Sequence, residues 1–361
     1  MKGEKARTVL ITGGAGFIGS NLAERLLGSR EINVRIFDNL SRTGVKGNLA
    51  WLKDKSCGNL EVIEGDVRNP EAVRKAMEGV TDVFHFAAQV AVTTSVENPA
   101  LDFEVNAAGT FNVLDAARRS KHRPFFLYTS TNKVYGALES VPVVPETTHY
   151  RAKAAGFKGV NESEKLDFHS PYGCSKGTAD QYVRDFARIY GLPTVVFRMS
   201  CIAGPRQFGN EDQGWVAHFL YSVLAEKRIT IYGDGLQVRD VLHVHDLIDA
   251  MVEAREQERI TRGQIYNLGG GPQRAFSVLE MLRAIENVTG KTARIDYREV
   301  RPGDQPLYIS DTAKLERDTG WRARRDIGTI LSDIREFWRD NNKATEPRLE
   351  GVRRAALGEV A

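Results

Sequence analysis

The chain has 361 residues, with 50 Lys and Arg, 47 Asp and Glu, and a formal net charge of +3. This length allows two lobes around a sizeable core, and no long basic run or basic–aromatic alternation indicates a nucleic-acid partner. No apolar run resembles a signal peptide or is long enough to cross a bilayer, so we expect no membrane partner. The three cysteines, Cys57, Cys174 and Cys201, show no CxxC spacing. We therefore expect no disulfide, no metal site and a cytoplasmic location.

Residues 8–38 have the pattern of one βαβ unit. An apolar run ends at the turn Gly13-Gly14-Ala15-Gly16-Phe17-Ile18-Gly19, a helical pattern follows, and a second apolar run ends at Asp38. The glycines let the chain turn sharply, approach a pyrophosphate at the positive end of the helix, and pack helix against strand. We therefore expect Gly13, Gly16, Phe17, Ile18 and Gly19 to bind a dinucleotide.

Two carboxylates at strand ends are predicted to select the cofactor. Asp38 can accept both hydroxyls of an adenosine ribose, and a 2′-phosphate there would meet a like charge, which favours NAD over NADP despite the nearby Arg42. Asp66 ends a third strand and is predicted to accept a hydrogen bond from the adenine amino group; an N-cap is the alternative role. Asn39 and Val67, the neighbours of these two residues in sequence, are further predicted cofactor contacts.

A fourth strand over residues 83–88 ends in small side chains. Ala87 and Ala88 would let a flat ring lie against the backbone, and Gln89 follows as a contact of cofactor and substrate. We interpret His85, inside this strand, as a packed histidine rather than a catalyst.

The remaining patterns predict an α/β fold: a Rossmann-type doubly wound parallel sheet with a smaller, mostly C-terminal α/β substrate-binding lobe. Later strands are expected at 124–131, 194–198 and 265–268; helices at 71–77, 103–119, 171–190, 241–256, 276–289 and 327–338; and a long loop at 137–169. The NAD-binding domain would comprise residues 1–199, completed by about 241–270. The second lobe would comprise 200–240 and 271–345, and 346–361 would be a frayed tail.

Tyr172 and Lys176 are the second sharp signal, because residues i and i+4 share one face of a helix. A phenol with a pKa of about 10 is a poor base at neutral pH. A neighbouring ammonium and the positive nicotinamide ring would lower that pKa, and the tyrosine would take a proton from a sugar hydroxyl while hydride leaves the same carbon. Thr131, at the carboxyl end of its strand, would hold the reacting oxygen or relay the proton.

Several motifs together resemble the extended short-chain dehydrogenase/reductases that modify nucleotide sugars, over about residues 8–338. They are Gly13…Gly16…Gly19, Asp38, Gly65-Asp66, His85-Phe86-Ala87-Ala88, the Ser130–Gly136 run, Tyr172/Lys176, the Gly233–Asp240 run and Arg301-Pro302-Gly303-Asp304. Within that family, the Leu166–Lys176 segment, the pair Asn132-Lys133 and the Asp212–Val216 segment look like the CDP-paratose (CDP-tyvelose) 2-epimerases.

The resemblance implies a tightly held NAD that is regenerated in each turnover, Thr131 as catalytic hydroxyl, Tyr172 as base and Lys176 as its lysine. It also implies a homodimer formed through two helices, one of them the Tyr172 helix. The predicted substrate contacts are Gln89, Thr131, Asn132, Lys133, Cys201, Gln213, Arg239 and Arg301.

Some of these contacts have alternative roles. Arg239 and Arg301 would bind the diphosphate through their planar guanidinium groups, with an ion pair to a neighbouring Asp as the alternative. Many relatives have asparagine at the position of Cys201. We interpret Cys201 as a small buried residue, with a proton-donor role as the alternative.

Four possible functions have to be compared. The first is inversion at C2 of a CDP-sugar by transient oxidation to a keto-sugar; a variant oxidises C3 and inverts C2 through an enol, with Lys133 and Cys201 as acid and base. A 4,6-dehydratase needs a carboxylic acid and a carboxylate where this chain has Asn132 and Lys133. A UDP-sugar 4-epimerase and a non-catalytic NAD-binding sensor are the remaining alternatives.

Overall fold

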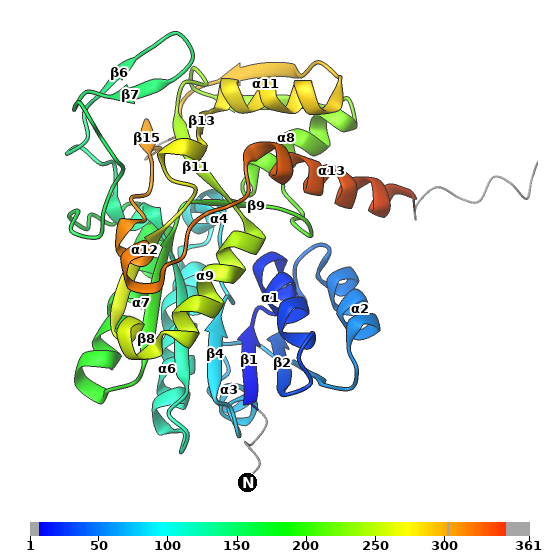
Figure 1. Cartoon of the computed structure of the whole chain (residues 1–361), viewed down its shortest axis with the longest axis vertical. Coiled ribbons are helices and arrows are strands. Elements are labelled where there is room, and N and C mark those ends of the chain that lie inside the picture. Colours follow the sequence, from blue (N-terminus) through cyan, green and yellow to red (C-terminus); the bar gives the residue numbers. More distant parts are fainter. Residues whose placement is uncertain (1–6, 302–303, 344–361) are drawn as a thin grey trace, which may run out of the picture.

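A parallel sheet of seven strands, in the order β12-β8-β5-β4-β1-β2-β3, forms the base of the molecule (Figure 1). The computed structural model describes residues 7–301 and 304–343. The strands of this sheet are β1 (Arg7–Thr12), β2 (Ile32–Asp38), β3 (Leu60–Glu64), β4 (Asp82–His85), β5 (Phe125–Thr131), β8 (Thr194–Met199) and β12 (Gln264–Leu268). Every residue of β4 and β5 is buried, as expected for parallel strands covered on both faces.

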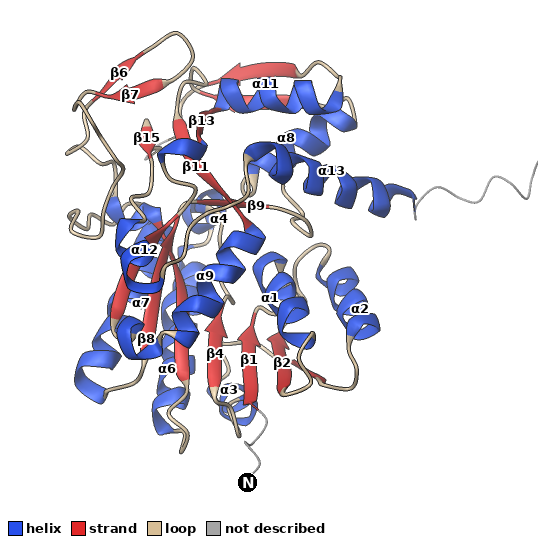
Figure 2. Ribbon diagram, viewed as in Figure 1, coloured by secondary structure: helices blue, strands red, loops and turns tan. Residues whose placement is uncertain are grey.

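Helices cover both faces of this sheet (Figure 2). One apolar cluster joins the sheet to helices α1 (Phe17–Leu27), α2 (Val45–Lys55) and α9 (Val244–Glu256). The other joins it to α3 (Pro70–Ala76), α6 (Gly109–Arg119) and α7 (Ser170–Tyr190). The prediction of a doubly wound parallel sheet is therefore confirmed. The strand order reverses between β1 and β4, which opens a crevice at their carboxyl ends.

A second group of elements packs around its own apolar cluster above the carboxyl ends of the sheet (Figure 1). Its helices are α8 (Trp215–Leu224), α11 (Val278–Thr289) and α13 (Ile327–Lys343). Its strands are β9 (Cys201–Ala203), β10 (Arg228–Tyr232), β11 (Val238–His243), β13 (Ala275–Ser277), β14 (Arg294–Arg298) and β15 (Leu307–Tyr308). The smaller elements elsewhere are α4 (Val92–Glu97), α5 (Pro99–Phe103), α10 (Glu258–Thr261), α12 (Ala313–Thr319), β6 (Val143–Pro145) and β7 (Tyr150–Ala152), with 3₁₀ turns η2 (Asn132–Tyr135) and η3 (Pro272–Arg274).

Several predicted boundaries were wrong. Helix α9 begins at Val244, because Val241, Leu242 and His243 belong to β11 and pair with β9. Likewise α11 begins at Val278, after Ser277 forms a reciprocal cap with Glu280. These errors share a cause: a short apolar run next to a helix has no period that separates strand from helix.

Three other predicted elements differ from the structure, and a fourth lies outside the described residues. The strand predicted over 83–88 ends at His85, and the loop 137–169 contains β6 and β7. The helix predicted over 103–119 widens into a π-helical turn, η1 (Glu104–Ala108), before α6 begins. The tail predicted over 346–361 lies outside the described residues.

A buried ion pair fixes α7 against the sheet. Arg198 on β8 donates to both carboxylate oxygens of Asp180 on α7, at 2.8 and 2.9 Å, and to the hydroxyl of Tyr135 at 3.1 Å. The two charged side chains are only 3% and 1% exposed. Removal of one partner leaves a buried charge without compensation.

We expect Asp180→Ala to lower the free energy of unfolding by about 3–5 kcal/mol, because it leaves the Arg198 guanidinium buried and unpaired. Urea denaturation followed by circular dichroism would measure the loss. Glu71→Ala, which breaks an exposed pair with Arg74, is the control and should change stability little. Equal, small effects in both variants would contradict a role for the buried pair.

Candidate active site at the carboxyl edge of the sheet

A cavity of about 1140 Å³ lies between the carboxyl ends of the sheet and the second group of elements. Its wall includes Tyr172 and all but one of the predicted substrate contacts: Thr131, Asn132, Lys133, Cys201, Gln213, Arg239 and Arg301. Gln89 is not among the residues that line it. The Gln89 amide instead donates to Ala91 and Asp102, at 2.8 and 2.9 Å.

The glycine-rich turn forms a cradle made of backbone alone. Gly13 has a φ of +68°, and a Cβ there would lie 2.7 Å from the nitrogen of Ala87. A Cβ on Gly19 would lie 2.3 Å from the carbonyl oxygen of Gly13, so helix and turn touch. Helix α1 starts after Gly16 without a side-chain cap, and such helix N-termini suit anions.

Asp38 is tied to this turn. Its carboxylate accepts hydrogen bonds from the backbone N–H groups of Ala15, at 3.0 Å, and Leu40, at 2.8 Å. Burial raises the pKa of Asp38, whereas these bonds and the charge of Arg42 lower it. The carboxylate therefore stands at the end of β2 beside the cradle, as its sequence position predicts.

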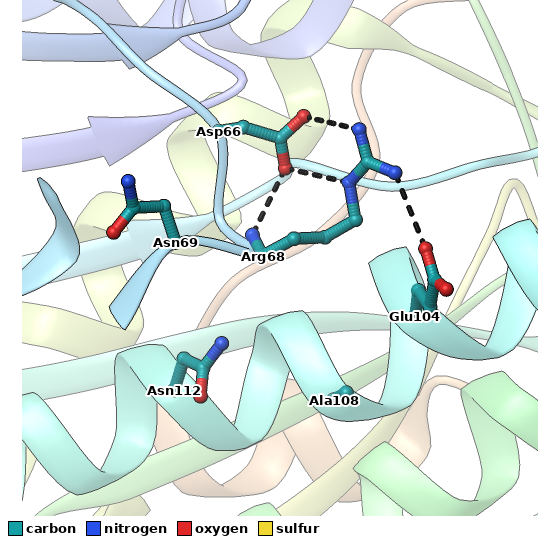
Figure 3. Close-up of a pocket in the computed structure, with 6 residues that line it drawn as sticks. All are labelled: Asp66, Arg68, Asn69, Glu104, Ala108 and Asn112. Carbon is teal, nitrogen blue, oxygen red and sulfur yellow. Dashed lines mark hydrogen bonds and ion pairs between the residues drawn. The ribbon is translucent and has the colours of Figure 1, made fainter. Parts of the chain in front are cut away.

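Asp66 is held by other protein groups, unlike the free acceptor that the sequence suggests (Figure 3). Arg68 donates from its guanidinium to both oxygens, each at 3.0 Å, and Asn39 donates at 3.1 Å. The hydrogen bond from Arg68 is the main reason that the pKa of Asp66 falls to about 2. An adenine amino group would have to share these oxygens. The N-cap of α3 is Asn69, not Asp66.

Tyr172 and Thr131 both lie on the cavity wall, where the Thr131 hydroxyl lowers the pKa of the phenol. Burial nevertheless raises the pKa of Tyr172 to about 12, and the charge of Asp102 adds to this rise. The expectation of a lowered phenol pKa is therefore wrong for the protein alone. Desolvation of the phenolate outweighs the effect of the Thr131 hydroxyl.

Lys176 is buried in the same part of the site. Its ammonium donates to the carbonyl of Thr129 at 2.7 Å and lies over the ring of Tyr128, 4.3 Å from its centre. Burial lowers the pKa of Lys176 to about 7, although the carboxylates of Asp102 and Asp180 oppose that shift. The lysine therefore loses its proton more easily here than in water.

His85 is a packed histidine, as interpreted from the sequence. It is 1% exposed, and its ring nitrogens contact the hydroxyls of Thr12, at 2.6 Å, and Thr110, at 2.9 Å. Burial lowers its pKa to about 3, so the ring is neutral at physiological pH.

Polar side chains of the second region face the residues that follow β5. Asp304 accepts from both Lys133, at 3.3 Å, and Arg239, at 2.6 Å. Asn132 donates to Gln305 at 3.0 Å. Asn132 and Lys133 carry an amide and an ammonium, so they cannot act as the carboxylic acid and the carboxylate that a 4,6-dehydratase needs.

The other predicted substrate contacts lie on the same wall. Cys201 accepts a hydrogen bond from the indole of Trp215 at 3.3 Å, and burial raises the pKa of its thiol. Arg301 lies over the ring of Tyr232, 3.9 Å from its centre, and 3.7 Å from the carboxylate of Asp212. Both predicted arginines line the cavity and are paired with an Asp, as the alternative interpretation predicts, whereas their contact with a diphosphate stays a prediction.

One group could suit a metal ion by composition. His243, His245 and Asp333 bring ligand atoms within 4.8 Å of one another, away from the cavity. The two ring nitrogens of His243 are already used: Nδ1 accepts from the backbone N–H of His245, at 2.9 Å, and Nε2 faces Asp333, at 3.0 Å. These hydrogen bonds explain the group without a metal ion: His243 caps the start of α9 and is joined to α13 through Asp333.

The family model described as GDP-mannose 4,6 dehydratase matches residues 10–334. The chain therefore belongs to this family of extended short-chain dehydrogenase/reductases, as its motifs indicate. It is 44% identical to the CDP-paratose 2-epimerase of Salmonella typhi over 320 residues, which cover 87% of this chain and 94% of that protein.

Solved structures show the same fold. The UDP-glucuronic acid 4-epimerase of Bacillus cereus, in complex with UDP-glucuronic acid and NAD, superposes with a TM-score of 0.80 at 26% identity, covering 92% of this chain and 99% of that one. The UDP-glucose 4-epimerase of Thermus thermophilus, in complex with NAD, gives a TM-score of 0.75 at 31% identity, with the same coverages.

Within residues 7–301 and 304–343, no helix has the length and apolarity needed to cross a membrane.

We expect Gly19→Ala to lower the free energy of unfolding by about 1–3 kcal/mol, because its Cβ would press on the backbone of Gly13 and Gly14. Gly47→Ala is the matched control: Gly47 lies in α2 with open space around its missing Cβ, so alanine should be neutral or stabilising. Urea denaturation of both variants checks this. Equal stabilities would show that the turn is not closely packed on α1.

Proposed function

We propose that this protein is an NAD-dependent epimerase that inverts C2 of a CDP-sugar of the CDP-paratose/CDP-tyvelose type. The observation that carries the proposal is that Thr131 and Tyr172 both line the wall of a cavity large enough for a nucleotide sugar. The 44% identity to a CDP-paratose 2-epimerase over most of both chains supports cytosine as the nucleotide base and C2 as the carbon that is inverted. The 4-epimerase structures solved with NAD support the cofactor.

The residues of the glycine turn fit a dinucleotide. The uncapped start of α1 would receive the pyrophosphate, and Asp38 beside it would accept the ribose hydroxyls. Ser130 Oγ is buried on the cavity wall and has no hydrogen-bond partner among the described residues, which leaves it for a ligand. When bound, NAD supplies the acceptor and donor of hydride and, when oxidised, a positive ring that favours the Tyr172 phenolate.

The chain's own residues move and hold the proton. Tyr172 takes the proton of the C2 hydroxyl and later returns it, which is general base and then general acid catalysis. Thr131, which lies on the cavity wall with Tyr172, would keep the reacting oxygen in reach of the phenol. The keto-sugar turns within the cavity between the two steps, so that its other face is reduced and no net oxidation occurs.

The geometry separates the competing reactions. The enol variant needs an acid and a base on opposite sugar faces, but Lys133 is paired with Asp304, and the raised pKa of the Cys201 thiol opposes its ionisation. We therefore favour the direct route. The 4,6-dehydratase reaction is disfavoured, because this chain has Asn132 and Lys133 at the positions where that reaction needs a carboxylic acid and a carboxylate. A UDP-sugar 4-epimerase remains the second candidate, favoured by the solved structures.

We further propose that the nucleotide-sugar diphosphate binds at Arg239 and Arg301, with Gln213 and Asn132 nearby. The lobe limits given from the sequence, residues 1–199 with about 241–270 and then 200–240 with 271–345, belong to this proposal. They are supported by α9, whose buried face joins the cluster of β1 and β5. The three free cysteines support a reducing compartment, for which we propose the cytoplasm.

A homodimer formed through α6 and α7 completes the proposal. These helices expose large aromatic side chains, including Phe111, 43% exposed, and Tyr182, 47% exposed. Their rings pack edge to face, with centres 5.8 Å apart, and so form one apolar patch across the two helices. Ile189 and Tyr190 extend the patch toward the end of α7.

The test of function is to incubate the purified protein with CDP-, UDP- and GDP-sugars in deuterated water and follow each carbon by NMR. We expect inversion at C2 of the CDP-sugar without solvent deuterium at C2. Incorporation at C2 would instead indicate the enol, and inversion at C4 of a UDP-sugar the second candidate. Tyr172→Phe should abolish inversion while NAD stays bound; undiminished turnover would remove Tyr172 from its role.

We expect Phe111→Glu to convert the dimer to a monomer, because a charge would be placed within the apolar patch. Sedimentation velocity would measure the change. Ile260→Glu, an equally apolar and exposed position on α10, is the control and should leave the dimer intact. A wild-type protein that sediments as a monomer would end the dimer proposal.

A further inference from the structure

Asp102 is a buried carboxylate that the mechanism above does not use. It lies in α5, just before the π-helical turn, and is 0% exposed. A buried carboxylate is costly unless hydrogen bonds or an opposite charge compensate it. Both kinds of compensation are present, and both come from elements that build the active site.

The two oxygens of Asp102 accept hydrogen bonds from three side chains. The Ser175 hydroxyl donates to Oδ2 at 2.5 Å, while the amides of Gln89 and Asn106 donate to Oδ1 at 2.9 and 3.1 Å. Asn106 also donates to Ser175, at 3.2 Å. Ser175 directly precedes Lys176, so the network joins the π-helical turn to the turn of α7 that carries Tyr172 and Lys176.

The network extends to the backbone that follows β4. Asn106 exchanges two hydrogen bonds with the main chain of Gln89, each 2.9 Å long. Ser175 also contacts the carbonyl of Tyr172 at 3.2 Å. Asp102 is thus the common acceptor at the junction of three segments: the stretch after β4, the π-helical turn and α7.

Asp102 also acts on the charges of the site. Burial raises its own pKa, while the hydrogen bonds and the charge of Lys176 lower it. Its charge is the strongest influence that keeps the pKa of Lys176 up, ahead of Asp180, and it raises the pKa of Tyr172.

We propose that Asp102 is a positioning residue for this reaction: it is the buried counter-charge of Lys176 and, through Ser175, holds the α7 turn that carries Tyr172. This inference rests on the proposed function for its link to turnover, but the geometry of Asp102 does not. Removal of the Asp102 charge lowers the pKa of both Lys176 and Tyr172. The carboxylate favours the Lys176 ammonium because their charges are opposite, and it disfavours the Tyr172 phenolate because their charges are alike.

Other ionisable groups face the same pair and bear on the test. On α7 itself Asp180 faces Lys176, but it is paired with Arg198. From the sheet, His85 on β4 is neutral, and Tyr128 on β5, with a pKa raised well above its usual value, stays neutral too. Asp102 is therefore the carboxylate whose charge a substitution can remove without breaking a salt bridge.

Asp102→Asn is the decisive variant, because it removes the charge and keeps the shape. The asparagine oxygen can accept from Gln89 and Asn106, and its amide can donate to Ser175, which then donates to the carbonyl of Tyr172. Asp115→Asn is the matched control: Asp115 is a carboxylate of α6 paired with Arg118 and Arg119 at the surface.

Two titrations are measured in wild type, Asp102→Asn and Asp115→Asn. The first is the ultraviolet absorbance of tyrosinate, with the same variant carrying Tyr172→Phe subtracted, which requires no turnover. The second is the pH profile of kcat/KM. We expect Asp102→Asn to shift the Tyr172 midpoint and both limbs of the profile down by about one pH unit, and Asp115→Asn to shift neither.

Unchanged midpoints in folded Asp102→Asn, or an equal shift in Asp115→Asn, would overturn the proposal. If no nucleotide sugar turns over, the absorbance titration still decides the role of Asp102, so the two proposals fail separately. If Asp102→Asn does not fold, Ser175→Ala keeps the charge and cuts the tie to α7. It should lower kcat at least tenfold with unshifted limbs, and a wild-type kcat would contradict the positioning role.

Discussion

The site depends on placing a phenol and an ammonium of one helix where their charged forms are poorly solvated. Burial alone works against both groups: it keeps the phenol of Tyr172 protonated and makes Lys176 easy to deprotonate. The structure offsets part of this cost: the Thr131 hydroxyl lowers the pKa of the phenol, while the carbonyl of Thr129 and the buried charge of Asp102 favour the ammonium. The pKa of the Tyr172 phenol has to be lowered further by a bound ligand. This fits a reaction that begins only when a positively charged ring lies beside the phenol.

The fold supplies this arrangement in layers. Strand β5 ends at the crevice in residues with hydroxyl side chains. The ion pair between Arg198 and Asp180 holds α7 against β8. The second region contributes Asp304 and Gln305, which contact Lys133 and Asn132 after β5, and Arg239, which pairs with Asp304. Under the proposed function, one lobe would carry the groups that act on the proton, and the other would carry charges that face a diphosphate.

Local sequence patterns predict the parts of this design that lie close together in the chain. The glycine turn, Asp38 and the Tyr172–Lys176 pair each occupy one short segment, and the sheet follows from regular apolar runs. Asp102 could not be found this way, because its partners Gln89 and Ser175 meet it only through the tertiary fold; its sole local signal is the spacing of four to Asn106. The pKa of Tyr172 was mispredicted for a related reason: sequence shows a neighbouring lysine but not the degree of burial. The start of α9 was missed because β9, which pairs with residues 241–243, lies forty residues earlier.

The sharing of Asp304 by Lys133 and Arg239 has a consequence for what the cavity admits. One carboxylate shared by two cations leaves this part of the wall with a net positive charge. A negatively charged occupant would therefore be favoured over a neutral sugar, because it could replace Asp304 as the partner of one cation.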